Sequence, residues 1–349
     1  VEGSADAIMR AKAATPIRLC TVNRATARTP QEECTARWQQ HTPEAVAATS
    51  ATAYFFARYL QEVLEVPVGV IVTCWGGTPV EAWMDRETMG GFREFDLSFL
   101  DGEARIEKPE MKPCGLYNAM IAPLVPYTVK GFLWYQGESN RLRPDQYRAL
   151  MPAFVKMLRE RWAQGELPFY FVEIAPFNYW GSDLAAFLRE AQCRAQEVIP
   201  NSGMVSTNDL VEPYEWCNIH PANKHDIGYR LACMALNRTY GKKAVHCDSP
   251  RFRSVEFADG KAVVSLDNAE YGFNRLVGIE GFELCGSDGV FHPADVTVDV
   301  QMRLVVSSKE VSEPAAVRYC FRNFQIGNLA NSWGLPVIPF RTDDFQPRP

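Results

Sequence analysis

The sequence predicts an α/β fold, in which a parallel sheet is covered by helices on both faces, followed by an all-β segment. Between residues 17 and 237, short apolar runs typical of buried strands alternate with longer stretches of helical periodicity. After Tyr240 and Gly241 this periodicity stops, and short β-type runs punctuated by Gly, Asp and Asn follow. We therefore expect an α/β domain over residues 1–242 and a β-rich domain over residues 243–349, packed on the first.

The same alternation sets the order of the elements. The first helix has Thr42 as its N-cap and Pro43 in its first turn, and the last helix carries Ile227, Leu231 and Met234 along one face. In the first domain, strands are expected at residues 17–22, 68–74, 130–135, 169–174 and 203–207. Helices are expected at residues 43–65, 145–162, 183–198 and 222–237. In the second domain, strands are expected at residues 254–257, 262–266, 281–285, 296–300, 304–307 and 317–321.

Composition excludes several classes of protein. The chain has 349 residues, of which 47% are hydrophobic and 22% charged, and this is enough for a large core. A formal net charge of -6 gives no basic footprint for nucleic acid, and no apolar run of about 18 residues is present to span a membrane. The ten cysteines are compatible with a few disulfides, but they are scattered singly without a Cys-x-x-Cys pair, so no metal site is expected.

Two glycine-bearing loops, each after a short apolar run, are the most informative local feature. One is Val70–Thr78, which ends in Trp-Gly-Gly-Thr, and the other is Gly131–Asn140, which ends in Gln-Gly-Glu-Ser-Asn. A third strand end, Val205–Leu210, leads to His220. In an open α/β sheet, ligands bind at the carboxyl ends of the strands. Two loops rich in hydrogen-bond donors and one histidine are the parts of an acyl-transfer site.

His220 is the candidate general base, and then general acid, of such a site. It lies between a β-run and a helix, where an imidazole can reach over the carboxyl edge of the sheet; the alternative is an ordinary loop histidine. An acidic partner would orient its ring, but its neighbour is Asn218. Asp209 and Glu212 could fold back toward it, or a backbone carbonyl could hold Nδ1, so a Ser-His dyad stays open.

The donor loops have plainer interpretations as well. Gly76 and Gly77 could form only a tight turn, although a glycine also lets a backbone N–H approach an oxyanion. The side chains of residues 136–140 must bond to one another or to a ligand if they are buried. Ser139 does not fit the Gly-x-Ser-x-Gly pattern of a nucleophile, because Arg141 occupies the last position. Support of the site by Glu138 and Asn140 is the favoured interpretation.

Arg189 and Gln192 share one face of the helix expected at residues 183–198. The simplest interpretation is a solvated face. Contact with a sugar or a carboxylate is the alternative, and the sequence does not favour it.

Several motifs together resemble those of the sialate O-acetylesterases, which are serine esterases of the SGNH hydrolase superfamily. The resemblance runs from about Ile17 to the end of the chain, with the motifs in the expected order. It rests on Trp75-Gly76-Gly77-Thr78 with Glu81-Ala82-Trp83, Leu116 to Leu124, Trp134 to Asn140, Ile219-His220-Pro221 with Asn223-Lys224, Ala316 to Tyr319, Gly334-Leu335-Pro336 and Pro339-Phe340-Arg341.

This resemblance implies an SGNH-type three-layer sandwich and a carbohydrate O-acetylesterase acting on sialic acid, with an O-acetylated sugar as substrate and neither metal nor organic cofactor. Gly77 and Asn140 would form the oxyanion hole and His220 would be the base. Support or substrate contact is implied for Gln136, Glu138, Trp75 and Asn218, the last of which stands where some members carry an acid. A secreted, periplasmic or lysosomal location is implied in the same way.

One part of the family pattern is missing from these residues. In the family the nucleophile lies in a Gly-Gln-Ser-Asn-Met block near the N-terminus, and this chain begins at Val1 without it. We therefore expect the serine on an upstream segment or on a companion chain. Two alternatives remain: an esterase for acetylxylan or another acetylated polysaccharide, and a non-catalytic carbohydrate-binding subunit.

Overall fold

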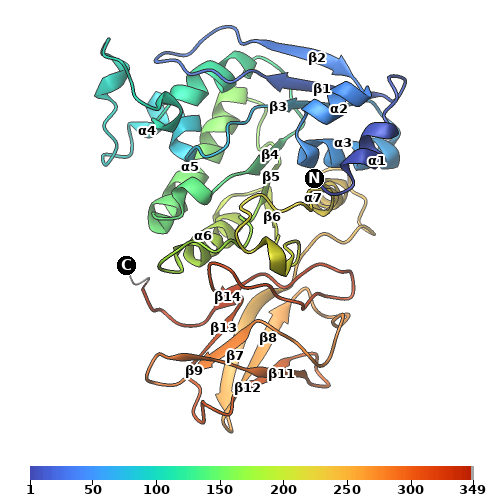
Figure 1. The fold of residues 1–349 in the computed structure, drawn as a ribbon, viewed down its shortest axis with the longest axis vertical. Coiled ribbons are helices and arrows are strands. Elements are labelled where there is room, and N and C mark those ends of the chain that lie inside the picture. The colour runs from blue at the N-terminus through green and yellow to red at the C-terminus, as the bar shows by residue number, and fades with distance from the viewer. Residues whose placement is uncertain (347–349) are drawn as a thin grey trace.

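A computed structural model describes residues 1–346 (Figure 1). The helices are α1 (Ser4–Met9), α2 (Pro43–Ala48), α3 (Ala51–Leu64), α4 (Arg86–Met89), α5 (Pro144–Trp162), α6 (Leu184–Val198) and α7 (His225–Arg238). The strands of the N-terminal part are β1 (Ile17–Val22), β2 (Ala36–Gln40), β3 (Val68–Val72), β4 (Phe132–Tyr135), β5 (Phe169–Val172) and β6 (Ser202–Val205). Short helical turns are η1 (Val80–Trp83), η2 (Ser98–Leu100), η3 (Pro109–Met111), η4 (Tyr117–Ile121), η5 (Ala122–Leu124), η6 (Glu138–Asn140) and η7 (Pro213–Glu215).

Two sheets take the place of the single parallel sheet that the sequence predicted. In the first, with the order β2-β1-β3, β1 pairs with β3 in parallel and with β2 antiparallel. In the second, with the order β4-β5-β6, all strands are parallel. The sequence did not predict β2 because all five of its residues are exposed and carry no apolar run.

The strands β3 and β4 are neighbouring edges of these two sheets in Figure 1, and within residues 1–346 no hydrogen-bonded ladder joins them. All four residues of β4 stay partly exposed, whereas every residue of β5 and β6 is buried. Strands of a parallel sheet are normally buried on both faces. β4 therefore has the exposure of an edge strand in the middle of the fold.

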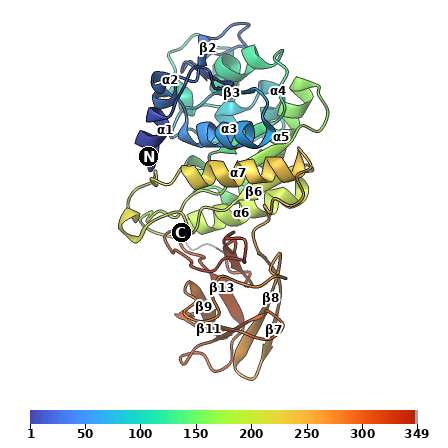
Figure 2. The same cartoon turned by 90° about the vertical axis from the view of Figure 1, so that its right-hand side faces the viewer.

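Helices cover both faces of the second sheet, as the sequence predicted (Figures 1 and 2). Successive side chains of a strand point to opposite faces. Phe169 and Phe171 of β5 accordingly pack in one core cluster with residues of α5 and α6. Tyr170 and Val172 pack in another with residues of α7 and with Leu60 of α3. This burial on both faces explains the continuous apolar run of β5.

The helix expected at residues 43–65 is interrupted. α2 ends before Thr49, whose backbone is extended, and α3 begins with Ser50 as a new N-cap that accepts from the Ala53 N–H at 3.3 Å. The expected cap at Thr42 is present, with its hydroxyl 3.4 Å from the Ala45 nitrogen. The apolar stripe hid the break, and the signal for it was the pair Thr49-Ser50.

The C-terminal β region, residues 251–341, consists of two antiparallel four-stranded sheets, as the texture of the sequence predicted. Their orders are β10-β9-β13-β14 and β11-β12-β8-β7, and their facing side chains form a separate core. The strands are β7 (Arg251–Ala258), β8 (Lys261–Asp267), β9 (Phe282–Cys285), β10 (Phe291–Pro293), β11 (Asp295–Val298), β12 (Leu304–Ser307), β13 (Ala316–Tyr319) and β14 (Phe340–Arg341).

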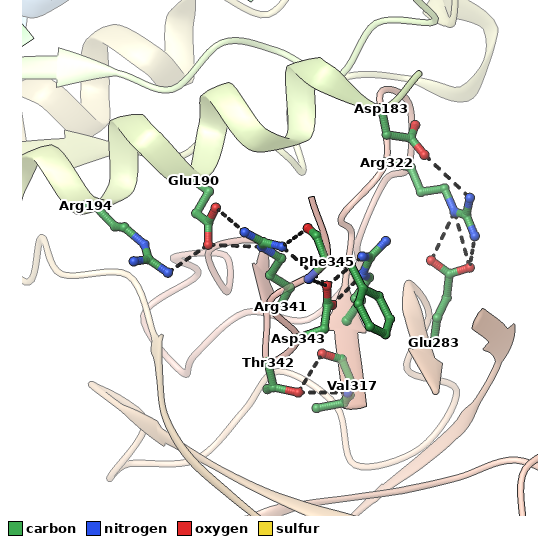
Figure 3. Close-up of polar contacts among 11 residues, drawn as sticks. Asp183, Glu190, Arg194, Glu283, Val317, Arg322, Arg341, Thr342, Asp343 and Phe345 are labelled. Carbon is green, nitrogen blue, oxygen red and sulfur yellow. Dashed lines mark hydrogen bonds and ion pairs between the residues drawn. The ribbon is translucent and has the colours of Figure 1, made fainter. Parts of the chain in front are cut away.

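An ionic network joins α6 to the C-terminal β region (Figure 3). Glu190 of α6 accepts from Arg341 of β14 at 3.2 Å and from Arg194 at 2.9 Å. At the other end of the interface, Arg322 pairs with Glu283 at 2.6 Å and with Asp183 at 3.5 Å. These charges fix the β region against the helix that covers the second sheet.

Arg189 and Gln192 are not on a solvated face, so that prediction was wrong. Both side chains are buried. Arg189 points across the interface and donates to the Cys320 carbonyl at 3.1 Å. Gln192 accepts from the Ile174 N–H at 3.0 Å and donates to the Gln136 carbonyl at 3.1 Å. A polar helix face was mistaken for a surface because its partners are backbone groups distant in the sequence.

All ten cysteines are free thiols; six of them are buried, two are partly buried, and Cys74 and Cys217 are exposed. No group of three or more metal-binding side chains occurs among residues 1–346. Over the same residues, no helix has the length and apolar character needed to cross a bilayer.

Candidate active site

The loop after β3 exposes a backbone donor at Gly77. Its φ is +80°, a left-handed conformation that favours glycine, and a Cβ there would meet no atom within 4 Å. The Gly77 N–H has no hydrogen-bond partner within residues 1–346. An N–H without a partner, on an exposed glycine, is a donor that an oxyanion could use.

Thr78 fixes the shape of this loop. Its hydroxyl donates to the Trp75 carbonyl at 2.7 Å and accepts from the Trp83 indole N–H at 2.9 Å. Trp75 is itself partly exposed, and the Arg24 guanidinium lies 5.8 Å from the centre of its ring. The ring of Trp75 also packs against the first core cluster.

Asn140, fully buried at the end of the second loop, has an amide with a defined orientation. Its Oδ1 accepts from the Val80 N–H at 2.9 Å and from Gln136 Nε2 at 2.7 Å. Its Nδ2 donates to Glu81 Oε2 at 2.8 Å, and Arg143 pairs with the other Glu81 oxygen at 2.5 Å. Because Nδ2 carries two hydrogens and only one is used, Asn140 keeps one N–H donor in a fixed direction.

Gln136 links the two loops. Its Nε2 also donates to the Thr78 carbonyl at 3.1 Å, and its Oε1 accepts from the Tyr147 hydroxyl at 3.3 Å. Together with the bond from Val80 to Asn140, this locks the loop after β3 to the loop after β4. The structure thus joins Gln136 and Asn140 to Thr78 and Val80, which follow Gly77 in the same loop.

Glu138, on the same loop, faces the segment that carries His220. Burial raises the pKa of its carboxyl, and backbone hydrogen bonds and the charges of Lys224 and His220 act in the opposite direction. Lys224 lies with its Nζ 3.4 Å from the Tyr135 hydroxyl at the end of β4. This electrostatic influence is the link between the second loop and His220.

His220 is exposed on the loop between η7 and α7. Its backbone N–H donates to Asn218 Oδ1 at 3.0 Å, and Asn218 Nδ2 donates to Glu215 Oε1 at 3.2 Å. Glu215 is buried and also accepts from the N–H groups of Ala222 at 2.8 Å and Glu212 at 3.1 Å. Sequence reasoning missed Glu215, although Glu-Pro-Tyr-Glu carries the signal of a capping box.

No acidic partner reaches the His220 ring within residues 1–346. Asp209 pairs instead with Arg230 through two bonds of 2.7 and 2.6 Å. Glu212 caps η7. Asn218 shapes the backbone and does not touch the ring. Ser139 lies in the turn η6, and its hydroxyl makes no hydrogen bond to a basic side chain among the same residues.

The second sheet has helices on both faces, and two interlocked donor loops lie near the loop that carries His220. These features define the class of the protein: it is an α/β protein with a hydrolase-like site. Comparison with known proteins gives the family. The family model for carbohydrate esterases described as sialic acid-specific acetylesterases matches residues 5–237. The chain belongs to this family, which confirms the resemblance seen in the sequence.

Individual relatives support the assignment of the chain to this family. The chain is 31% identical over 236 residues to the sialate O-acetylesterase of Homo sapiens, covering 62% of this chain and 44% of that protein. It is 27% identical over 345 residues to the sialate O-acetylesterase of Mus musculus, covering 83% of this chain and 63% of that protein. The crystal structure of a carbohydrate acetylesterase from Xanthomonas citri superposes with a TM-score of 0.86 at 32% identity, over 99% of this chain and 77% of that one. The chain thus spans less than two thirds of the curated relatives.

Proposed function

We propose that this chain is part of a carbohydrate O-acetylesterase that hydrolyses O-acetyl esters of sialic acid through a serine acyl-enzyme. The observation that carries the proposal is the lock between the two donor loops. Gln136 and Asn140 hold the loop of Gly77 against the loop after β4, and each loop keeps one unused N–H donor. Such fixed donors stabilise the oxyanion of acyl transfer, and one of them contributes roughly 100- to 1000-fold in rate.

In this mechanism the serine Oγ attacks the acetyl carbonyl carbon, and His220 takes the hydroxyl proton. The carbonyl oxygen becomes negatively charged and accepts hydrogen bonds from the Gly77 N–H and from Asn140 Nδ2. The bond from the carbonyl carbon to the sugar oxygen then breaks, and His220 returns its proton to that oxygen. Water attacks the acetyl-serine with His220 again as base, and acetate and the free serine are released.

The remaining predicted residues have supporting roles in this proposal. Gln136 fixes the amide of Asn140. Asn218 shapes the backbone at His220. Glu138 counters the charge of His220 when the ring is protonated. Trp75 forms a wall for the sugar.

We place the nucleophile on a segment outside these 349 residues, either upstream or on a companion chain. The unpaired edges of β3 and β4 support this. Each edge strand runs parallel to its one neighbour, so a further parallel strand between them would pair with both and would complete an SGNH-type three-layer sandwich.

The test is to label the assembled native enzyme with a fluorescent phosphonate, to map the modified peptide by mass spectrometry, and to measure acetate release. We expect the label on a serine outside this chain, release from O-acetylated sialic acid, and loss of turnover in His220→Ala with an unchanged unfolding temperature. Label on Ser139, or near-normal turnover in His220→Ala, would contradict the mechanism.

Substrate choice separates the alternatives in the same assay. Faster release from acetylated xylan oligosaccharides than from O-acetylated sialic acid would favour a polysaccharide esterase. Absence of both label and turnover would favour a carbohydrate-binding subunit. If the esterase assignment holds, we also expect the protein in a secreted, periplasmic or lysosomal location, as the family resemblance implies.

A further inference from the structure

Two loops beside the candidate site expose large aromatic rings next to each other. Trp180 is 85% exposed, Tyr214 is 76% exposed and Trp216 is 42% exposed. The rings of Trp180 and Trp216 lie 6.3 Å apart, edge to face, at 85°. Single exposed aromatic side chains are common, but two exposed rings in contact, with a third exposed ring two residues away along the chain, are typical of a binding surface. We call these three residues the aromatic platform.

The platform is held in place by hydrogen bonds. The Asn178 N–H donates to the Trp216 carbonyl at 2.9 Å and so joins the two loops. Asn323, from the C-terminal β region, donates to the carbonyls of Tyr179 at 2.8 Å and Ser182 at 2.9 Å. The loop of Trp180 is therefore braced on both sides of the exposed ring, which lowers the entropy that binding would cost.

The platform also adjoins the candidate site. Trp216 lies on the same loop as His220, four residues earlier. Arg141 connects the other side: its guanidinium stacks 4.4 Å from the ring of Tyr179 and donates to the Glu138 carbonyl at 3.4 Å. One cation thus touches both the loop of Asn140 and the loop of Trp180. A ligand that extends from His220 along this side meets the aromatic rings next.

We propose that the aromatic platform binds the sugar units that adjoin the acetylated residue of a glycan. The apolar C–H face of a pyranose ring packs against flat aromatic faces, and its hydroxyls reach the polar rim, here Arg141 and the loop carbonyls. The inference rests on the proposed function, because it takes the acetylated sugar to lie at His220. Binding at the aromatic platform makes the enzyme selective for acetyl esters within oligosaccharides over the free acetylated monosaccharide.

The test measures binding rather than turnover, and it uses the assembled native enzyme with sugars that carry no acetyl ester. Free sialic acid and the trisaccharide sialyllactose are compared by isothermal titration. We expect the trisaccharide to bind about tenfold more tightly, which corresponds to about 1.4 kcal/mol. Trp180→Ala and Trp216→Ala should remove this difference and leave the affinity for sialic acid unchanged, and Trp180→Phe should retain most of it.

Trp333→Ala is the matched control. This tryptophan is 49% exposed and stacks 3.6 Å from His246, away from the loops of the platform, so its replacement should leave both affinities unchanged. Equal affinities for the two sugars in the wild-type chain, or a trisaccharide preference that survives Trp180→Ala, would overturn the proposal. So would shielding of Trp180 from acrylamide quenching in the assembled enzyme without sugar, because another polypeptide segment would then cover the platform. An inactive esterase that still shows the trisaccharide preference would refute the proposed function and leave the sugar surface standing.

Discussion

Asn140 shows how one side chain can be both a structural and a chemical group. A buried amide without partners would cost about 1–3 kcal/mol, and Asn140 avoids this cost by bonding to Val80, Gln136 and Glu81. The same three bonds leave a single N–H of Nδ2 unused. Fixing the acceptor side of the amide thus orients the donor side, which is the side that the proposed chemistry uses.

Asn140→Ala should therefore affect both turnover and stability. We expect kcat of the assembled enzyme to fall roughly 100- to 1000-fold with little change in KM, because the donor acts on the transition state. The unfolding free energy should fall by about 1–3 kcal/mol. Steady-state kinetics and urea unfolding measure the two effects. Asn237→Ala, which removes a 2.7 Å bond to the Val245 carbonyl far from the loops, should lower stability alone. Unchanged kcat in Asn140→Ala would contradict its role.

Residues that stand in a distinctive local motif were the easier ones to predict from the sequence. Gly77 is part of a Gly-Gly pair after a buried strand, and Gln136 and Asn140 belong to a run of polar side chains after another, so all three could be named as candidates. Thr78, Arg143 and Glu215 could not, because each acts through a partner that only the folded chain brings near. The open question of an acid for His220 had the same cause: Asp209 is close in sequence but is paired with Arg230.

Among the elements, the loop between β6 and α7 depends on one buried carboxylate. Glu215 accepts from two backbone N–H groups and from Asn218, and no regular secondary structure holds His220. A carboxylate can accept all of these bonds because it has no hydrogen to donate. An amide in its place must turn a donor toward at least one of the N–H groups.

Glu215→Gln should loosen this loop without unfolding the chain. We expect amide hydrogen exchange at Glu212 or Ala222 to become faster, and kcat to fall about 10- to 100-fold through displacement of His220. Mass spectrometry of peptides from residues 209–224 measures the exchange. Peptides from β5, which is buried on both faces, serve as the internal control and should keep their protection. Unaltered exchange in this loop together with unaltered kcat would show that Glu215 does not position His220.

Elements with strong apolar periodicity were well predicted from the sequence, and those without it were not. The strands β5 and β6 bury every residue, and the helices α5 and α6 each bury nine, so burial produced a clear apolar pattern in the sequence. The exposed strand β2 carries no such pattern. The sequence did not predict the break at Thr49-Ser50, because the apolar stripe of the helix continues past it.

For the molecule as a whole, the contact between α6 and the C-terminal β region relies on buried charge. Asp343 supports it from within the β region: it pairs with Arg318 at 2.7 Å and, at 3.3 Å, with Arg341, which reaches Glu190 of α6 (Figure 3). Burial alone would raise the pKa of Asp343, but the two arginines outweigh it and hold the pKa below its ordinary value. A carboxyl with a lowered pKa contributes stability above the pKa of the unfolded state, about 3.9, and this contribution is lost as the pH falls through the folded value.

Asp343→Asn should lower the unfolding free energy by about 3–5 kcal/mol at pH 7, because it leaves two buried guanidinium groups short of a partner. The difference from the wild-type chain should shrink as the pH falls below about 4, because the carboxyl of the unfolded wild-type chain takes up a proton first and that of the folded chain follows at its lower pKa. Urea unfolding at several pH values measures this. Asp344→Asn, at an exposed neighbour without an ion pair among residues 1–346, should be near neutral. A pH-independent difference would contradict the assignment.

The open edges of β3 and β4 bear on how the isolated chain behaves in solution. Within residues 1–346 neither edge pairs with a further strand, so each presents a row of backbone N–H and C=O groups without a ladder partner. Such rows can pair edge to edge between two copies of this polypeptide. The 349-residue chain purified by itself should therefore associate as its concentration rises, and a short synthetic peptide with β propensity added during refolding should suppress this association.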